Sequence, residues 1–307
     1  MKRRVVGCMT GTSIDGLDAA LVEAEGTGLS MTARVVRGVS HGLGGLAVPL
    51  RALADQVPMT AGDIAHLARA FSLVHIGAVR ELLGAERADL ICVHGQTVFH
   101  KPPLSWQLMQ PAPIAAAMDC PVVYDLRAAD VAAGGEGAPI TPLADWVLLR
   151  GDEERVVVNL GGFANFTRLP RAREGVGPGQ VLGGDICACN QLLDSIARTL
   201  MSVPFDDGGK RGAAGLIHEV ALAELKGILM DQRRGRRSLG TGDELGGWIV
   251  RFGERVSGAD LSATACSAIG QAVAAAVAGA DRVLVAGAVS YTHLRAHETK
   301  ANLVCRL

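Results

Sequence analysis

Residues 5–22 read VVGCMTGTSIDGLDAALV and indicate two apolar strands joined by a tight polar turn. Gly11 and Gly16 can adopt the positive φ angles that a tight turn needs. The hydroxyls and free backbone N–H groups of such a turn can surround one anion, which is how loops bind phosphate. Asp15 and Asp18 suit phosphate only if a divalent cation sits between. The stretch therefore predicts a phosphate-binding hairpin, with a ligand-free Gly/Asp-rich turn as the alternative.

The composition of the 307-residue chain indicates about two domains. Hydrophobic residues make up 49% and aromatic residues only 4%, so a core of Ala, Val and Leu is expected. The net charge of −1 gives no indication of a nucleic-acid partner. The first apolar run ends at Thr10, too early for a signal peptide, and polar residues within 261–280 indicate a buried helix rather than a membrane span. Seven cysteines without a framework spacing favour reduced thiols and a cytoplasmic location.

Downstream of the hairpin, the pattern predicts an α/β domain over residues 1–126. Apolar residues recur at helical spacing in one long stretch, and short apolar runs alternate with it. The predicted strands cover residues 32–39, 88–93, 105–108 and 121–124, and the predicted helices cover residues 61–83 and 111–118. Such alternation is typical of the α/β class.

Residues 155–169, RVVVNLGGFANFTRL, repeat the form of the opening hairpin. Gly161 and Asn165 are four residues apart, like Gly11 and Asp15. The two hairpins form a weak internal repeat. They predict two related domains, each offering a hairpin loop to a shared ligand across a cleft.

We place the domain boundary near residue 127, before the glycine-rich stretch 130–142, because glycine permits a hinge or a close backbone approach. A second α/β domain is then expected over residues 127–287. Its predicted helices cover residues 143–149, 216–230 and 259–279, and a final strand covers residues 282–287. Residues 288–307 form a tail of different character, without glycine.

Residues 181–194, VLGGDICACNQLLD, predict a strand that brings Asp185 to a turn before a helix from Asn190 to about Met201. A carboxylate at a strand end, opposite a phosphate loop, is suited to act as a general base. A turn or helix N-cap aspartate is the alternative.

The sequence predicts no dedicated metal centre. Cys187 and Cys189 form a C-x-C pair, but two further zinc ligands at a suitable spacing are missing from the sequence. His293 and His297 have the four-residue spacing of helical metal sites, again without an evident third ligand.

Taken in order, these motifs resemble the anhydro-N-acetylmuramic acid kinase family, which belongs to the sugar kinase/actin/heat-shock-chaperone superfamily. The resemblance covers about residues 4–287, and its ordered set of motifs is far more specific than any one of them. The motifs are Gly11–Asp18, His94–Thr97, Asp125–Arg127, Asp130–Pro139, Asn159–Asn165, and Asp185 with Asn190 and Asp194. The implied fold is an α/β, two-domain, ribonuclease-H-like (actin/hexokinase-type) fold with an interdomain cleft.

The resemblance implies a kinase that uses ATP and water to open 1,6-anhydro-N-acetylmuramic acid and to phosphorylate O6. The product, N-acetylmuramic acid 6-phosphate, belongs to peptidoglycan recycling and amino-sugar catabolism. Asp185 matches the family's catalytic base, which takes a proton from the water that attacks C1. ATP with Mg²⁺ would be bound by Gly11, Thr12, Ser13, Ile14, Asp15, Gly16, Leu17, Asp18, Gly161, Gly162 and Asn165. The sugar would be bound by His94, Gln96, Thr97, Arg127, Asp130 and Asn190.

The implied partners are this small-molecule sugar and ATP, with no nucleic acid and no membrane, and a homodimer is left open. Two departures from the family pattern matter. Cys187-Ala188-Cys189 stands where a Gly-Pro-Gly turn is most often expected. After Gly287 the family continues with a Gly-Gly-Gly loop, so we expect a truncated or out-of-frame C-terminus here. A kinase of another sugar and an inactive ligand-binding relative are the alternative functions.

Overall fold

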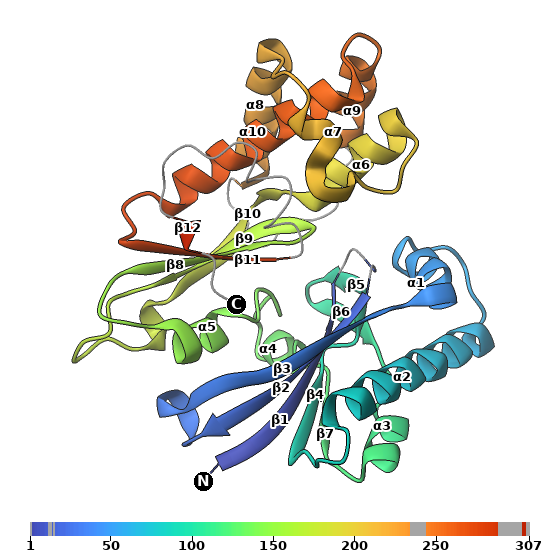
Figure 1. Ribbon diagram of the computed structural model, residues 1–307, viewed down its shortest axis with the longest axis vertical. Helices are drawn as coiled ribbons and strands as arrows, with labels where there is room; N and C mark the ends of the chain where they lie inside the picture. Colours follow the sequence, from blue (N-terminus) through green and yellow to red (C-terminus); the bar gives the residue numbers. More distant parts are fainter. Residues whose placement is uncertain (1, 12–13, 15, 234–243, 288–302, 305–307) are drawn as a thin grey trace. The chain divides into compact units, whose positions relative to one another are not determined.

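The computed structural model describes residues 2–11, 14, 16–233, 244–287 and 303–304 (Figure 1). The chain divides into two compact units, Met1–Ile140 and Thr141–Leu307. Each unit has a five-stranded mixed sheet with helices packed on it. The described helices and strands agree with the predicted α/β class.

The sheet of the first unit has the strand order β3-β2-β1-β4-β7. Its strands are β1 (Lys2–Thr10), β2 (Gly16–Glu25), β3 (Thr32–Gly42), β4 (Leu90–Val93) and β7 (Val122–Val123). The first three form an antiparallel meander, and β4 and β7 continue it in parallel with β1. The predicted opening hairpin and third strand are therefore confirmed.

Four helices and a separate hairpin complete the first unit. The helices are α1 (Ala47–Ala54), α2 (Ala61–Leu83), α3 (Pro111–Met118) and α4 (Ala128–Ala132), and the hairpin consists of β5 (Gln96–Lys101) and β6 (Leu104–Leu108). Helix α2 begins at a capping box, in which the Thr60 hydroxyl accepts from the Asp63 N–H at 3.1 Å. Its apolar face packs on β2 and β3, and this contact builds the core of the unit.

The sheet of the second unit has the order β10-β9-β8-β11-β12. Its strands are β8 (Arg155–Leu160), β9 (Phe163–Leu169), β10 (Leu182–Ala188), β11 (Arg282–Ala286) and β12 (Leu303–Val304). Again an antiparallel meander is followed by two parallel strands. The two sheets thus share one strand order, and the repeated hairpin occupies the same place in each.

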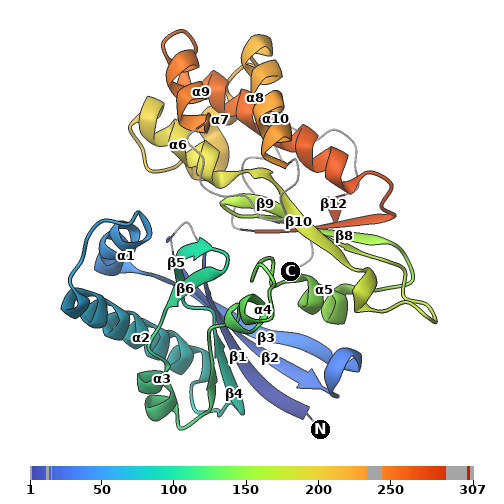
Figure 2. The ribbon, with the colours of Figure 1, turned by 180° about the vertical axis from the view of Figure 1, so that it is seen from behind.

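The helices of the second unit cover both faces of its sheet (Figures 1 and 2). They are α5 (Pro142–Leu149), α6 (Asn190–Met201), α7 (Lys210–Ala213), α8 (Glu219–Arg233), α9 (Glu244–Gly253) and α10 (Gly258–Val277). The main core joins Val156, Val158 and Leu160 to the α6–α10 side, while Trp146 of α5 packs with Val157 on the other face. Helix α10 has the length and apolar composition of a membrane span, but 50% of its apolar window is buried inside this unit.

The segment after residue 127 remains with the first unit in the structure, whereas the sequence placed the boundary before it. Arg127 Nη1 donates to the Gly137 carbonyl at 2.7 Å, and helix α4 contacts β6. These contacts attach α4 and the glycine-rich stretch to the first unit, so the division falls at Ile140 and Thr141.

Candidate functional site

The β1–β2 turn of the first unit carries the predicted phosphate loop. Thr12, Ser13 and Asp15 lie outside the described residues. The Gly11 carbonyl accepts from the Ile14 N–H and from Gln96 Nε2, both at 3.2 Å. The turn is therefore held from inside by its own backbone and from the β5 strand by a side chain.

Two apolar residues of this motif, Ile14 and Leu17, anchor the turn in the core, with exposed fractions of 4% and 0%. Ile14 has a φ of +55°, a conformation that costs free energy in a β-branched residue. Burial of the side chain offsets this cost and fixes the path of the turn. The side chains of Ile14 and Leu17 thus fix the position of the described part of the turn.

Asp18 is exposed at the start of β2 and accepts a hydrogen bond from Ser40 Oγ at 2.5 Å. The carboxylate is a hard oxygen donor beside the turn. Mg²⁺ in kinases is commonly held by one or two carboxylates together with phosphate oxygens and water. The chemistry of Asp18 fits such an ion.

The predicted sugar-binding segment His94–Thr97 adjoins this turn. Thr10 Oγ1 donates to the Gly95 carbonyl at 2.8 Å, next to the bond from Gln96 to Gly11. Gly95 has a φ of +74°, and a Cβ there would lie 2.9 Å from the Leu108 carbonyl oxygen. Only glycine suits this position. The first unit thus brings its predicted nucleotide and sugar residues together.

A hydrogen bond joins the side chains of His94 and Arg127. Arg127 Nη2 donates to His94 Nε2 at 3.1 Å, and His94 Nδ1 donates to the Gly95 carbonyl at 2.8 Å. Since guanidinium only donates, Nε2 must be the unprotonated nitrogen of a neutral ring. Burial, reinforced by the Arg127 charge, lowers the pKa of His94. The pair therefore presents a fixed cation beside a neutral imidazole.

Asp130 organises the glycine-rich stretch of the first unit. Its Oδ2 accepts from the Gly137 N–H at 2.7 Å. A Cβ on Gly135 would lie 2.2 Å from the same oxygen, so the loop can wrap around the carboxylate only with glycine there. This arrangement supports a positioning role for Asp130.

In the second unit, the Gly161–Gly162 turn is attached to the start of helix α6. The Gly162 carbonyl accepts from Cys189 N at 2.9 Å, and the Gly161 carbonyl accepts from Asn190 N at 3.1 Å. The Asn190 side chain is 7% exposed, and its Nδ2 donates to the Leu160 carbonyl at 3.5 Å. Asn190 therefore joins the glycine turn to helix α6.

A polar row crosses the sheet near this turn. Strand register places Asn159 opposite Asn165, and Asn165 opposite Asp185. Directly opposite residues of an antiparallel pair lie on the same face, and all three are half-buried. The register shifts between Asp185 and Cys187, so a β-bulge follows the carboxylate at once. Bulges of this kind re-aim side chains beside active sites.

The sequence matches one protein family over nearly its whole length. The model described as anhydro-N-acetylmuramic acid kinase matches residues 3–299. The chain belongs to the anhydro-N-acetylmuramic acid kinase family. A curated anhydro-N-acetylmuramic acid kinase of Acidiphilium cryptum is 38% identical over 293 residues, covering 92% of this chain and 78% of the relative. That of Azorhizobium caulinodans is 36% identical over 239 residues, covering 73% of this chain and 62% of the relative.

Among solved structures, a ROK family glucokinase from Streptomyces griseus in complex with glucose and AMPPNP is similar over 94% of this chain and 84% of its own, with 16% identity and a TM-score of 0.38. The predicted family and the two-unit α/β class are confirmed by the family match and the described topology. The family match extends to residue 299, beyond the point at which the motifs stopped. Residues 288–302 and 305–307 of the predicted atypical tail lie outside the described residues.

For this member of the anhydro-N-acetylmuramic acid kinase family, the motifs did not reveal a polar group on the β5–β6 hairpin. Thr97 pairs with Gln107, and His100 pairs with Ser105, so the four side chains share one face. Of these, only Thr97 was predicted. Polar residues at alternate positions 105 and 107 were the available signal, because residues two apart on a strand share a face.

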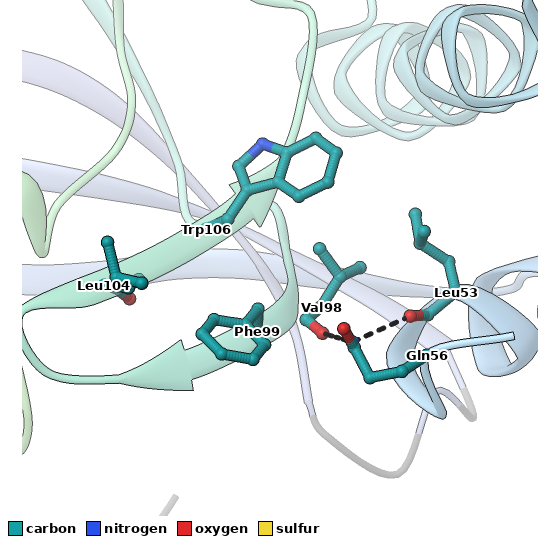
Figure 3. Close-up of a pocket in the computed structure, with 7 residues that line it drawn as sticks. Leu53, Gln56, Val98, Phe99, Leu104 and Trp106 are labelled. Carbon is teal, nitrogen blue, oxygen red and sulfur yellow. Dashed lines mark hydrogen bonds between the residues drawn. The ribbon is translucent and has the colours of Figure 1, made fainter. Parts of the chain in front are cut away.

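A hollow of about 290 Å³ lies on the apolar side of the same hairpin (Figure 3). Its lining residues are Leu53, Gln56, Val98, Phe99, Leu104, Ser105 and Trp106. Gln56 closes one wall by donating to the Val98 carbonyl at 2.9 Å (Figure 3). None of the predicted site residues lines this hollow.

Proposed function

We propose that the chain uses ATP and water to convert 1,6-anhydro-N-acetylmuramic acid into N-acetylmuramic acid 6-phosphate. Membership of a kinase family implies ATP as the phosphoryl donor. The observation that carries the proposal in this chain is the position of Asp185. The carboxylate is half-buried at a β-bulge, with Asn165 opposite it and Asn159 next in the row. Such a carboxylate, set among amide groups on a rigid sheet, is suited to positioned proton abstraction.

In the proposed reaction, Asp185 takes one proton from a water molecule while the water oxygen bonds to C1 of the sugar. The C1–O6 bond breaks, and its electron pair passes to O6. O6 then bonds to the γ-phosphorus of ATP, and the bond from that phosphorus to the ADP oxygen breaks. The products are the 6-phosphorylated sugar, ADP and the proton left on Asp185. The protein's contribution is to align these groups, which is the main source of catalysis in phosphoryl transfer.

We assign the ATP phosphates to the backbone of the Gly11–Asp18 turn and to Gly161 and Gly162. When bound, Mg²⁺ would neutralise charge on the phosphates, and Asp18 is the described carboxylate able to hold it. Asn165 stays a predicted nucleotide ligand, although its position opposite Asp185 also allows a role beside the base.

We assign the sugar to the first unit, on His94, Gln96, Thr97 and Arg127. The Arg127 guanidinium, held by the neutral His94 ring, offers a charged partner to a polar ligand, and Gln96 Oε1 and Thr97 Oγ1 offer uncharged ones. Asp130 is proposed to support these contacts through its bond to the Gly137 N–H. Asn190 of the second unit stays a predicted sugar ligand. We further propose a cytoplasmic location and a place in peptidoglycan recycling, because the reaction consumes ATP and a cell-wall amino sugar.

The test is the Asp185→Asn variant, with formation of ADP and phosphorylated sugar measured on 1,6-anhydro-N-acetylmuramic acid. We expect a loss of activity of about 10²–10⁴-fold, the usual contribution of a general base, with ATP binding retained. Asp207→Asn is the matched control, because the Asp207 side chain is 85% exposed and its ion pair among the described residues is a long one, 3.7 Å from Lys210 Nζ.

Wild-type activity restricted to ordinary N-acetyl hexosamines would reject this substrate in favour of another sugar. Sugar and ATP binding without any turnover would instead identify an inactive ligand-binding relative. Full activity of Asp185→Asn would show that the reaction does not need the Asp185 carboxylate.

A further inference from the structure

The two faces of the β5–β6 hairpin differ in chemistry. Strand register pairs Phe99 with Trp106 on one face, and these side chains line the apolar hollow (Figure 3). The other face carries Thr97, His100, Ser105 and Gln107, which we call the polar hairpin face. An antiparallel hairpin that keeps only polar groups on one side needs partners for them.

A hydrogen-bond chain runs along the polar hairpin face. Gln107 Nε2 donates to Ser105 Oγ at 2.9 Å, and Ser105 Oγ lies 2.9 Å from His100 Nδ1. The Ser105 hydroxyl has one proton to donate, and His100 Nδ1 is the acceptor within reach among its described contacts, so we assign the proton to this bond. The ring proton then lies on Nε2. Burial and the nearby Arg127 charge lower the pKa of His100, against the opposing effect of Glu136, which agrees with a neutral ring.

Three atoms of the polar hairpin face are buried without a hydrogen-bond partner among the residues that the structure describes. They are Gln107 Oε1, Thr97 Oγ1 and His100 Nε2. Gln107 itself is only 7% exposed. Buried polar groups left unpaired cost free energy, and a ligand that pairs them would recover it. The face therefore offers an acceptor at Gln107, a donor at His100, and a hydroxyl able to do either.

We propose that the polar hairpin face binds the acetamido group of the amino sugar. The amide N–H would donate to Gln107 Oε1, and the amide carbonyl would accept from His100 Nε2–H or Thr97 Oγ1–H. This inference rests on the proposed function, because it takes the ligand to be an N-acetylated sugar. An anionic group suits the face less well at Gln107, where it would meet the amide carbonyl oxygen. Near His100 the charges of Arg127 and Glu136 oppose each other.

The polar hairpin face is partly accessible in the free chain. Thr97, His100 and Ser105 are only half-buried. The neighbouring helix α4 contacts β6, and none of its five residues is buried, so a shift of this helix on ligand binding would cost little packing.

The experiment compares binding of two sugars that share the bicyclic anhydro ring. These probes are 1,6-anhydro-N-acetylglucosamine, which has the acetamido group, and 1,6-anhydroglucose, which has a hydroxyl in its place. Isothermal titration calorimetry without nucleotide measures their Kd for the wild-type chain and for Gln107→Leu. We expect Gln107→Leu to weaken binding of the N-acetylated sugar about tenfold, the effect of one lost hydrogen bond, and to leave 1,6-anhydroglucose unchanged.

Gln271→Leu makes the same chemical change on the exposed face of α10, where Gln271 Nε2 bonds Ser267, and should alter neither Kd. Gln107→Leu also removes the hydrogen bond that Gln107 Nε2 donates to Ser105 Oγ, so a lower Tm would report this structural bond. The ligand role is reported by the difference between the Kd changes of the two sugars, which a general loss of structure would not produce. If Gln107→Leu does not fold, the isosteric Thr97→Val variant is measured in the same way.

Equal weakening for both sugars, or no weakening for either, would overturn the inference. Selective weakening for the hydroxyl sugar would overturn it as well. If the wild-type chain binds the N-acetylated sugar with this selectivity but fails to phosphorylate 1,6-anhydro-N-acetylmuramic acid, the inference holds and the proposed function fails. If it binds neither probe, the inference fails, while phosphorylation of 1,6-anhydro-N-acetylmuramic acid still tests the proposed function.

Discussion

At the scale of single residues, the position of Asn165 allows two roles that can be separated. Its motif predicts a contact with the nucleotide, while the strand register sets it opposite Asp185. A hydrogen bond donated to a carboxylate favours its charged, proton-accepting form. If Asn165 acts on Asp185, its side-chain amide should affect the pH dependence of kcat. If it binds the nucleotide, the amide should affect the KM for ATP.

We predict that Asn165→Leu moves the acid limb of the kcat–pH profile upward by about one pH unit, the equivalent of about 1.4 kcal/mol. The KM for ATP should stay unchanged. Asp145 lies on the same sheet face, where it accepts from Thr167 Oγ1 at 2.6 Å and where burial raises its pKa. The Asp145→Asn variant is the control. If it shifts the acid limb of the kcat–pH profile, that limb reports Asp145 and not Asp185. A raised KM for ATP with an unmoved acid limb would instead make Asn165 a nucleotide ligand.

His75 controls the pH dependence of stability in the first unit. The side chain is fully buried in α2, Nδ1 bonds the Phe71 carbonyl at 2.9 Å, and Nε2 has no partner among the described residues. Burial lowers the pKa of His75 from 6.5 to about 4. The unfolded chain therefore binds more protons than the folded chain between these values, so stability is complete above pH 6.5 and falls as the pH approaches 4.

We predict that His75→Phe removes up to about 3 kcal/mol of this pH-dependent loss. Urea denaturation between pH 7 and pH 4 measures it. The matched control is His66→Phe on the same helix, because His66 is exposed. Parallel pH profiles for wild type and His75→Phe would show that His75 does not carry the effect.

At the scale of elements, the start of helix α2 depends on one hydroxyl. Thr60 caps the helix by accepting from Asp63 N at 3.1 Å. Thr60→Ala should cost about 1 kcal/mol of unfolding free energy, since a lost N-cap leaves a helix donor unpaired. Chemical denaturation measures the change. Thr27→Ala is the control, because Thr27 precedes a 3₁₀ turn without a side-chain cap bond and should leave stability unchanged.

The sequence predicted elements well where one period extended over many residues. Helices 61–83 and 111–118 begin and end as predicted, because helical spacing and an N-terminal cap or proline mark them. Helix α1 and strand β5 were not predicted. Val98 occupies a register shift in β5, which interrupts the alternation by which a strand is found.

The candidate site was predictable only in part. The motifs predicted Asp185 and the two glycine turns, because glycine marks a tight turn locally and the carboxylate follows a short apolar run. They did not predict that Asn159, Asn165 and Asp185 form one row, because register is set by pairing across strands. Nor did they reveal the hydrogen-bond chain from Gln107 to His100, because Ser105 on β6 meets His100 on β5 only across the hairpin.

At the scale of the whole molecule, each unit has its own hydrophobic core. Leu21 is fully buried in the core of the first unit, and Trp248 is fully buried in that of the second. Leu21→Ala should destabilise the first unit by about 2–5 kcal/mol, the usual cost of such a cavity. Calorimetry should show one transition lowered, while Trp fluorescence, dominated by the buried Trp146 and Trp248, follows the other. A single transition that shifts as a whole would show that the two units unfold together.

The division of the chain at Ile140 and Thr141 places all described strands of each sheet on one side of a single junction. A peptide ligation at this junction would join two separately produced segments without splitting either sheet. One segment can then carry ¹⁵N while the other stays unlabelled. NMR spectra of the ligated chain would report on the Asp185 row or on the polar hairpin face separately, each in the presence of the other half.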